Sequence, residues 1–357
     1  MKKQIKYKKF IIIFVSFILL LTVVYFAVRA IFPLPPEREM VIEENKILID
    51  TIEYIDDNID GVYAEFTPYD DESLLVAASF YYYEDSEIKP FTRIYKVKKN
   101  GEILGTFDVD YAAENIYVFE DGNIGVSYHT GEKTEDRIYY LREYSPEYEF
   151  ISEKQLPEKV IIVSRMVYSQ GSFYGYSDSG MLILDRNLNI TAEHNVSDPE
   201  NQLLNYCEDT DKNQYFYLLE KNPDASYYST SYYIRPMNGG SDVSIDVPKE
   251  SVFAVMAGYV PRPGDSEYPF YATLVNNYGF WSYFFDHDIG GAYICGLNTD
   301  GSVVTLLPYE GDMGFNFYQS VPIGEKRYYA ETERDHIDRT LYKVDLYLYE
   351  YNSYYAD

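Results

Sequence analysis

Apolar and polar positions follow two different patterns along the chain, and the change falls at a proline-rich segment. Residues 10–32 are apolar with one charge, Arg29. After this segment, apolar and polar residues alternate in short runs separated by Gly, Asn, Asp and Pro. A long unbroken apolar run is typical of a helix that crosses a bilayer, whereas alternation with a period of two is typical of half-buried strands.

The first pattern predicts a single membrane-spanning helix. Its 23 residues, at about 1.5 Å per residue, reach the ~30 Å thickness of the bilayer core. Five lysines in residues 1–9 favour a cytoplasmic N-terminus. We therefore expect a single-pass protein of the cell membrane in four parts: a cytoplasmic stub (1–9), a signal anchor (10–32), a linker (33–44) and an extracytoplasmic domain (45–357). The alternative is a signal peptide cleaved after Ala30, although its apolar stretch is unusually long.

The second pattern predicts a series of β-hairpins. Ile94–Lys98 alternates, reaches the turn pair Asn100-Gly101, and continues as a returning strand over Ile103–Phe107. Asn-Gly between two alternating runs is the strongest short-range signal for a hairpin. The same figure recurs around Pro146, Asn187, Asn238 and Asp300. The extracytoplasmic domain is therefore expected to be all-β, with no helix after Pro36.

The spacing of these turns predicts a β-propeller. Successive markers are 46, 41, 51 and 62 residues apart, and repeats of about 40–50 residues with several short strands are typical of propeller blades. A second hairpin between the markers, such as the one turning at Glu120–Asn123, completes a four-stranded blade. We predict about six blades with room for a seventh, and two β-sandwich domains as the alternative fold.

The ends of the domain suggest how the ring closes. Leu341–Tyr351 alternates but has no following partner, and Lys46–Tyr54 has no partner at the start. Pairing the two would place an N-terminal strand in the last blade and remove an exposed strand edge. In this architecture, with its membrane anchor, the chain resembles membrane-anchored β-propeller domains of bacterial cell envelopes. The resemblance covers residues 45–357 and names no family.

Charge and cysteine content exclude some partners. The chain has 58 acidic and 30 basic residues, and residues 1–36 hold six basic residues and no acid, so the rest carries 24 against 58, a net −34. Such a charge repels nucleic acid. Cys207 and Cys295 are too few for a disulfide framework. We expect two separately buried thiols, with a disulfide between them as the alternative.

Two segments contain candidate binding residues. Asp209, Asp211, Asn213 and Glu220 occupy positions 1, 3, 5 and 12 of a calcium-loop pattern, which makes Ca²⁺ the candidate cofactor. However, Gln214 stands where the loop needs glycine, so a polar turn is the competing interpretation.

The second segment, 276–291, combines aromatic side chains with acids. Its candidate ligand-binding residues are Trp281, Tyr283, Asp286, His287 and Asp288. Aromatic faces beside carboxylates suit sugar binding. The competing interpretation is an aromatic strand that ends in a charged loop.

The leading functional hypothesis is a non-catalytic, surface-anchored binding, sensor or scaffold domain. The sequence lacks a Gly-x-Ser-x-Gly nucleophile motif, and its four histidines are scattered. A nine-residue stub is too short for a signalling domain, so a sensor would need a membrane protein partner; cell-wall glycan is the other candidate partner. The competing hypothesis is an envelope enzyme acting on glycans, as a hydrolase or lyase, near Asp286 and Asp288.

Overall fold

The computed structural model describes most of the chain, and the architecture is that of the described residues. The described residues are 14–24, 37–55, 59–84, 87–131, 136–197, 201–220, 231–246, 254–256, 261–276, 292–309, 312–336 and 341–356. Residues 14–24 form a helix inside the predicted span. Within the described ranges, no helix is both long and apolar enough to cross a membrane.

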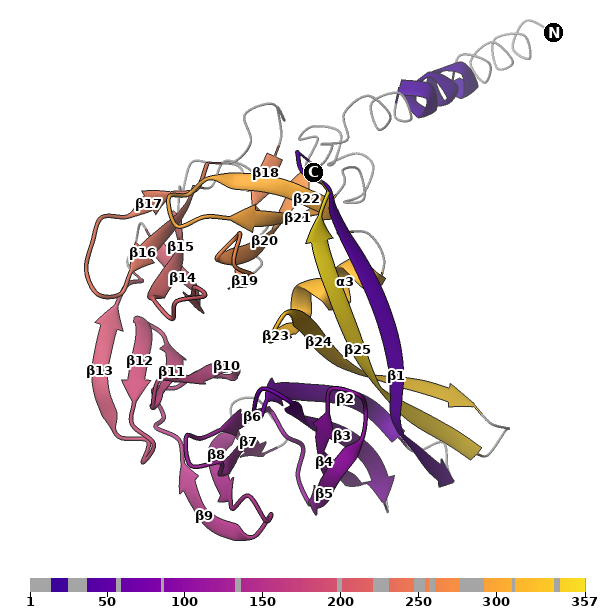
Figure 1. Ribbon diagram of the computed structural model, residues 1–357, viewed down its shortest axis with the longest axis vertical. Helices are drawn as coiled ribbons and strands as arrows, with labels where there is room; N and C mark the ends of the chain where they lie inside the picture. The colour runs from indigo at the N-terminus through magenta and orange to yellow at the C-terminus, as the bar shows by residue number, and fades with distance from the viewer. Residues whose placement is uncertain are drawn as a thin grey trace, which may run out of the picture.

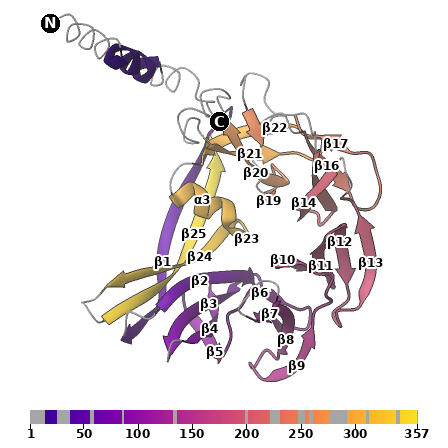
Figure 2. The ribbon, with the colours of Figure 1, turned by 180° about the vertical axis from the view of Figure 1, so that it is seen from behind.

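The strands form six antiparallel sheets arranged in a ring (Figure 1; Figure 2 shows the other side). The predicted six-bladed propeller is therefore confirmed. Blade 1 consists of β2 (Ile59–Pro68), β3 (Ser73–Glu84), β4 (Glu87–Lys98) and β5 (Ile103–Val109). Blade 2 consists of β6 (Asn115–Val118), β7 (Ile124–Thr130), β8 (Ile138–Tyr144) and β9 (Phe150–Gln155). Blade 3 consists of β10 (Ile162–Ser169), β11 (Ser172–Ser177), β12 (Gly180–Leu184) and β13 (Ile190–Asn195).

Blades 4 and 5 continue the ring. Blade 4 consists of β14 (Asn201–Glu208), β15 (Gln214–Glu220), β16 (Tyr232–Pro236) and β17 (Val243–Ser244). Blade 5 consists of β18 (Ala254–Met256), β19 (Arg262–Pro263), β20 (Phe270–Asn276), β21 (Ala292–Leu297) and β22 (Val303–Pro308). Both β18 and β19 pair with β20. The long spacing before Asp300 therefore does not add a seventh blade to the described structure.

Blade 6 combines the two ends of the propeller chain. It contains β23 (Val321–Ile323), β24 (Lys326–His336), β25 (Leu341–Tyr355) and, on its outer side, β1 (Met40–Ile55). β1 pairs antiparallel with β25 from Met40↔Tyr355 to Ile55↔Leu341. The predicted closure is confirmed, and β1 begins at Met40, inside the segment predicted as a linker.

The core lies between blades. One cluster, for example, joins Leu74 and Val76 of blade 1 to Val344, Leu346 and Leu348 of blade 6. All six clusters are built from residues 40 to 351. The propeller thus carries its own core, so residues 37–357 are expected to fold without the N-terminal segment.

A short helix, α3 (Asp312–Gln319), corrects the expectation that no helix follows Pro36. Its eight residues are too few for a helix that is stable alone. Phe317 and Tyr318 are buried, and the Asn316 amide donates to Glu331 Oε2 at 3.1 Å. Tertiary packing therefore stabilises a helix that periodicity could not reveal.

The two cysteines are free and buried, as expected. Both belong to the same apolar cluster, which joins blades 4 and 5.

Candidate functional site

The predicted calcium segment forms a tight turn between β14 and β15. Asp209 Oδ1 accepts the backbone N–H groups of Asp211 at 3.0 Å and Asn213 at 2.8 Å. Asp209 Oδ2 accepts from the Asn213 amide at 2.9 Å and from the Tyr215 hydroxyl at 3.0 Å. The structure therefore brings the first three candidates together, but both oxygens of Asp209 already stabilise the turn.

Glu220 lies at the opposite end of β15 from this turn. The strand has seven residues, which at ~3.3 Å each span roughly 20 Å. Glu220 Oε2 accepts the Tyr233 hydroxyl at 3.0 Å. The described residues contain no group of three or more His, Cys, Asp or Glu side chains placed to hold a metal ion. Calcium binding at the turn stays a prediction. Glu220 lies too far from the turn to be one of its ligands.

Residues 277–291 of the aromatic and acidic segment lie outside the described residues, so Trp281, Tyr283, Asp286, His287 and Asp288 stay predictions. The strands that flank it, β20 and β21, pair with each other from Phe270↔Leu297 to Val275↔Ala292.

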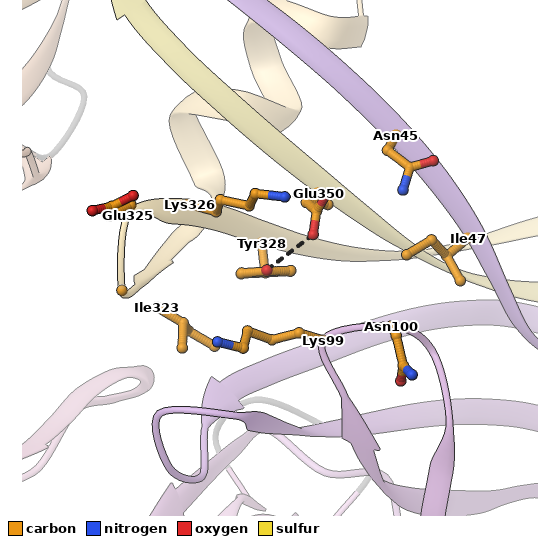
Figure 3. A pocket seen from close by; sticks show the side chains of 10 residues that line it. Asn45, Ile47, Lys99, Asn100, Ile323, Glu325, Lys326, Tyr328 and Glu350 are labelled. Carbon is orange, nitrogen blue, oxygen red and sulfur yellow. Dashed lines mark hydrogen bonds and ion pairs between the residues drawn. The ribbon is translucent and has the colours of Figure 1, made fainter.

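Ten described residues at the junction of blades 1 and 6 line a pocket (Figure 3). We call it the seam pocket; it has a volume of about 600 Å³. Its lining comes from β1, the β4–β5 turn, the β23–β24 hairpin and β25, and consists of Asn45, Ile47, Lys99, Asn100, Ile323, Gly324, Glu325, Lys326, Tyr328 and Glu350. The volume falls within the range typical of small-molecule sites.

A fixed carboxylate lies on the blade 6 side of the pocket. Glu350 Oε1 accepts from Lys326 Nζ at 2.8 Å, and Glu350 Oε2 accepts from the Tyr328 hydroxyl at 3.1 Å (Figure 3). Burial, together with the Glu350 charge, raises the pKa of Tyr328 well above its ordinary value. The tyrosine therefore remains protonated at neutral pH, and the two donors orient the carboxylate.

The blade 1 side contributes a lysine and an amide. Lys99 Nζ donates to Glu72 Oε1 at 3.1 Å, and Glu72 is 79% exposed. Asn100 Oδ1 accepts the Glu102 N–H at 3.1 Å. An ammonium has three donors and an Asn amide has two. The acceptors Glu350 and Asn100 Oδ1 are thus engaged within the protein, while both lysines keep donors for a ligand.

Two glycines allow this geometry. Gly101 has φ +86°, and a Cβ built there would lie 2.4 Å from Ile47 Cγ2. Only glycine lets the β4–β5 turn approach β1 this closely. Gly324, with φ +65°, turns the opposing hairpin.

A second polar cluster lies where β2 meets the segment before β6. Glu65 is on β2, and burial, with added repulsion from Glu114, raises its pKa to about 7 against the opposing effect of Arg262. Glu114 Oε1 lies 2.6 Å from His129 Nδ1. Arg262 Nη2 donates to Gln319 Oε1 at 2.7 Å. Glu65 can therefore change its protonation state near neutral pH.

No sequence pattern points to either the seam pocket or the Glu65 cluster. The seam pocket joins residues 45–47 to residues 99–100 and 323–350, and apart from the turn residue Asn100 its members belong to no sequence motif. The predicted pairing of the first strand with the last is the one signal that could have brought them together.

The fold defines the class of protein: a six-bladed β-propeller closed by an N-terminal strand. No family model matches the chain, and no curated protein matches it in sequence.

Several solved structures have a similar fold. One is the β-propeller domain of the Trilobed protease from Pyrococcus furiosus, described as having an open velcro topology: identity 14%, TM-score 0.41, 80% of this chain and 82% of that chain covered. A luciferin-regenerating enzyme has 10% identity and TM-score 0.36, with coverage of 85% and 95%. A subtype N10 neuraminidase-like protein of A/little yellow-shouldered bat/Guatemala/060/2010 has 10% identity and TM-score 0.38, with coverage of 87% and 99%. Propellers serve many functions, so these similarities concern the fold alone.

Proposed function

We propose that this protein is a membrane-tethered, extracytoplasmic binding domain, without catalytic activity of its own, whose ligand occupies the seam pocket. The observation that carries the proposal is the pocket itself, with apolar walls at Ile47 and Ile323 and oriented polar groups around them. A concave site with an apolar lining and a few fixed polar groups is the usual form of a small-molecule site.

The tether rests on the sequence. Residues 10–32 have the length and apolarity of a membrane span, and the preceding lysines favour a cytoplasmic N-terminus. The acidic propeller would then lie outside the cell. Its single helix would connect it to any membrane protein that senses whether the seam pocket holds a ligand.

The unused donors of the pocket indicate a ligand rich in acceptors. Lys99 and Lys326 each pair with one carboxylate and retain two further N–H groups. Each Glu350 oxygen already accepts one hydrogen bond, from Lys326 or from Tyr328. Carboxylate, phosphate or sugar oxygens on the ligand would complement these ammonium groups.

Thermal melts of residues 37–357 with small carboxylates, inorganic phosphate and mono- and disaccharides test this function. We expect at least one compound class to raise the Tm in a concentration-dependent way. Asn45→Trp, which fills the exposed mouth of the pocket, should abolish the rise. Glu53→Trp, on the same strand but outside the pocket, should retain it. If every compound that raises the Tm acts equally on both variants, the seam pocket is not the ligand site.

The competing glycan-enzyme hypothesis keeps its sequence support, which is that Asp286 and Asp288 follow Trp281 closely in the sequence. Alanine at both aspartates separates the two hypotheses. An enzyme would lose turnover of cell-wall glycan with an unchanged melt, whereas a seam-pocket binding domain would retain its ligand.

A further inference from the structure

The chain attaches to the rim of the propeller as soon as it reaches the described ectodomain. Glu37 N donates to Thr305 Oγ1 at 2.8 Å, and Arg38 N donates to Thr305 O at 3.1 Å. Ala356 N donates to Glu39 O at 2.9 Å. Residues 37–39 are therefore fixed between β22 of blade 5 and the end of β25 in blade 6, where Figures 1 and 2 also show the C-terminus.

The distance between this attachment and the predicted span is short. Four residues, 33–36, lie between Phe32 and Glu37, and an extended chain of four residues reaches at most roughly 14 Å. A globular domain of about 320 residues has a radius of gyration of about 20 Å and is therefore roughly 50 Å across. The tether is thus much shorter than the propeller, so the attached rim must stay near the bilayer.

The side chains at this rim suit a lipid headgroup layer. Tyr354 is 47% exposed. Tyrosine is an amphipathic side chain that favours membrane interfaces. Arg38 lies over the Tyr355 ring, 4.5 Å from its centroid, and forms an ion pair with Glu267. We call Arg38, Tyr354 and Tyr355 the tether patch.

We propose that the tether patch contacts the lipid headgroups and that the propeller stands on its edge, with the junction of blades 2 and 3 farthest from the membrane. This inference rests on the proposed membrane tether. The opposite rim and both ends of the central axis then remain accessible to extracellular partners. A flat orientation, with one end of the axis against the bilayer, is the arrangement that the test must exclude.

Energy transfer from a single label to a lipid-borne acceptor tests the orientation in the full chain. Native Cys207 and Cys295 are 5% and 0% exposed, so a thiol-reactive dye will favour an introduced exposed cysteine. Ala356→Cys reports on the tether patch. Asn187→Cys and Asp178→Cys lie on blade 3 beyond opposite ends of β12 (Gly180–Leu184) and form a matched pair.

The expected result in phosphatidylcholine vesicles is strong transfer at position 356 and at least about twofold weaker, mutually similar transfer at positions 187 and 178. Strong transfer at only one of the two blade 3 positions would show a flat orientation and overturn the proposal. Equal transfer at all three would place blade 3 as close to the bilayer as the tether patch and also overturn it. Flotation of the full chain, with residues 37–357 as the control, is read first. If the full chain does not float, the tether itself is wrong and both proposals fail.

Discussion

Blades 3 and 6 have the same four-stranded architecture but are assembled from the chain in different ways. Blade 3 is contiguous from Ile162 to Asn195, and tight turns join its strands. Blade 6 takes three strands from the end of the chain and its outer strand from residues 40–55. The contrast shows that local turn chemistry can specify blade 3, whereas blade 6 forms only when the first strand of the propeller pairs with the last.

Deleting β1 should have the largest effect on this comparison. Residues 56–357 would lose Ile49 from the core and expose the edge of β25, which pairs with β1 at 15 positions. We expect the loss of a cooperative thermal transition, because the deleted contacts rival a total stability of about 5–15 kcal/mol. The control is residues 37–357. A truncated protein that melts like the control would show that the ring is stable without closure.

Matched core truncations should separate the two blades kinetically. Leu182 in blade 3 and Leu346 in blade 6 are both 0% exposed. Replacing either with alanine should cost about 2–5 kcal/mol of unfolding free energy. If blade 3 forms early, Leu182→Ala should slow refolding, whereas Leu346→Ala should mainly speed unfolding. Stopped-flow measurements in denaturant would reveal the difference, and identical effects on both rates would contradict the assembly order.

Alanine substitutions at two glycines test how tightly the seam pocket is packed. Gly101 has φ +86° with Ile47 in the way of a Cβ, while Gly239 has φ +93° and nothing within 4 Å. Alanine at either position carries backbone strain of about 1–2 kcal/mol. Gly101→Ala should cost a further 1–3 kcal/mol or so from overpacking. Equal unfolding free energies for the two variants in urea would mean that the structure around Gly101 relaxes to accommodate the added Cβ.

Glu65 should make stability depend on pH at the junction of blades 1 and 2. Its folded pKa is about 7 and its ordinary value 4.5, so between these values the folded protein binds more protons than the unfolded chain. Stability should therefore fall as pH rises through this window, by about 1–3 kcal/mol. Glu65→Gln should remove that decrease in urea unfolding between pH 5 and 8. A variant with the slope of the wild type would assign the slope to other groups.

The smallest expected effect concerns the turn at Asp209. Asp209→Ala should destabilise blade 4 by about 1 kcal/mol, because two backbone N–H groups lose their acceptor. Melts with excess calcium and with chelator would show whether the turn also binds the ion. A calcium-dependent rise in the wild type that Asp209→Ala loses would make it a site, whereas identical curves would leave it a structural turn.

The sequence predicted those features that depend on neighbouring residues. Asn100-Gly101 located the β4–β5 hairpin, and regular turn spacing led to the number of blades. Even the pairing of β1 with β25 followed, because both strands lacked a local partner. Helix α3 was missed, since its stability comes from Phe317 and Tyr318 packing into the core.

The candidate site could not be predicted in the same way. Lys99 and Lys326 are separated by more than 200 residues, and they line one pocket only because blades 1 and 6 adjoin across the closure. Glu65 is equally ordinary in the sequence, and its raised pKa arises from burial beside Glu114. Both features depend on packing between blades, which the pattern of a single strand does not encode.

The attachment of residues 37–39 directly ahead of β1 has a mechanical consequence. With the proposed membrane tether in place, tension between it and a partner bound to the propeller would act first on the strand that closes the ring. A force along β1 would load its hydrogen bonds to β25 in shear, so that many of these backbone bonds resist together. A force across the strand would instead break the hydrogen bonds one after another, starting at Met40. Rupture forces that change with pulling direction in single-molecule stretching would show that the closure bears load.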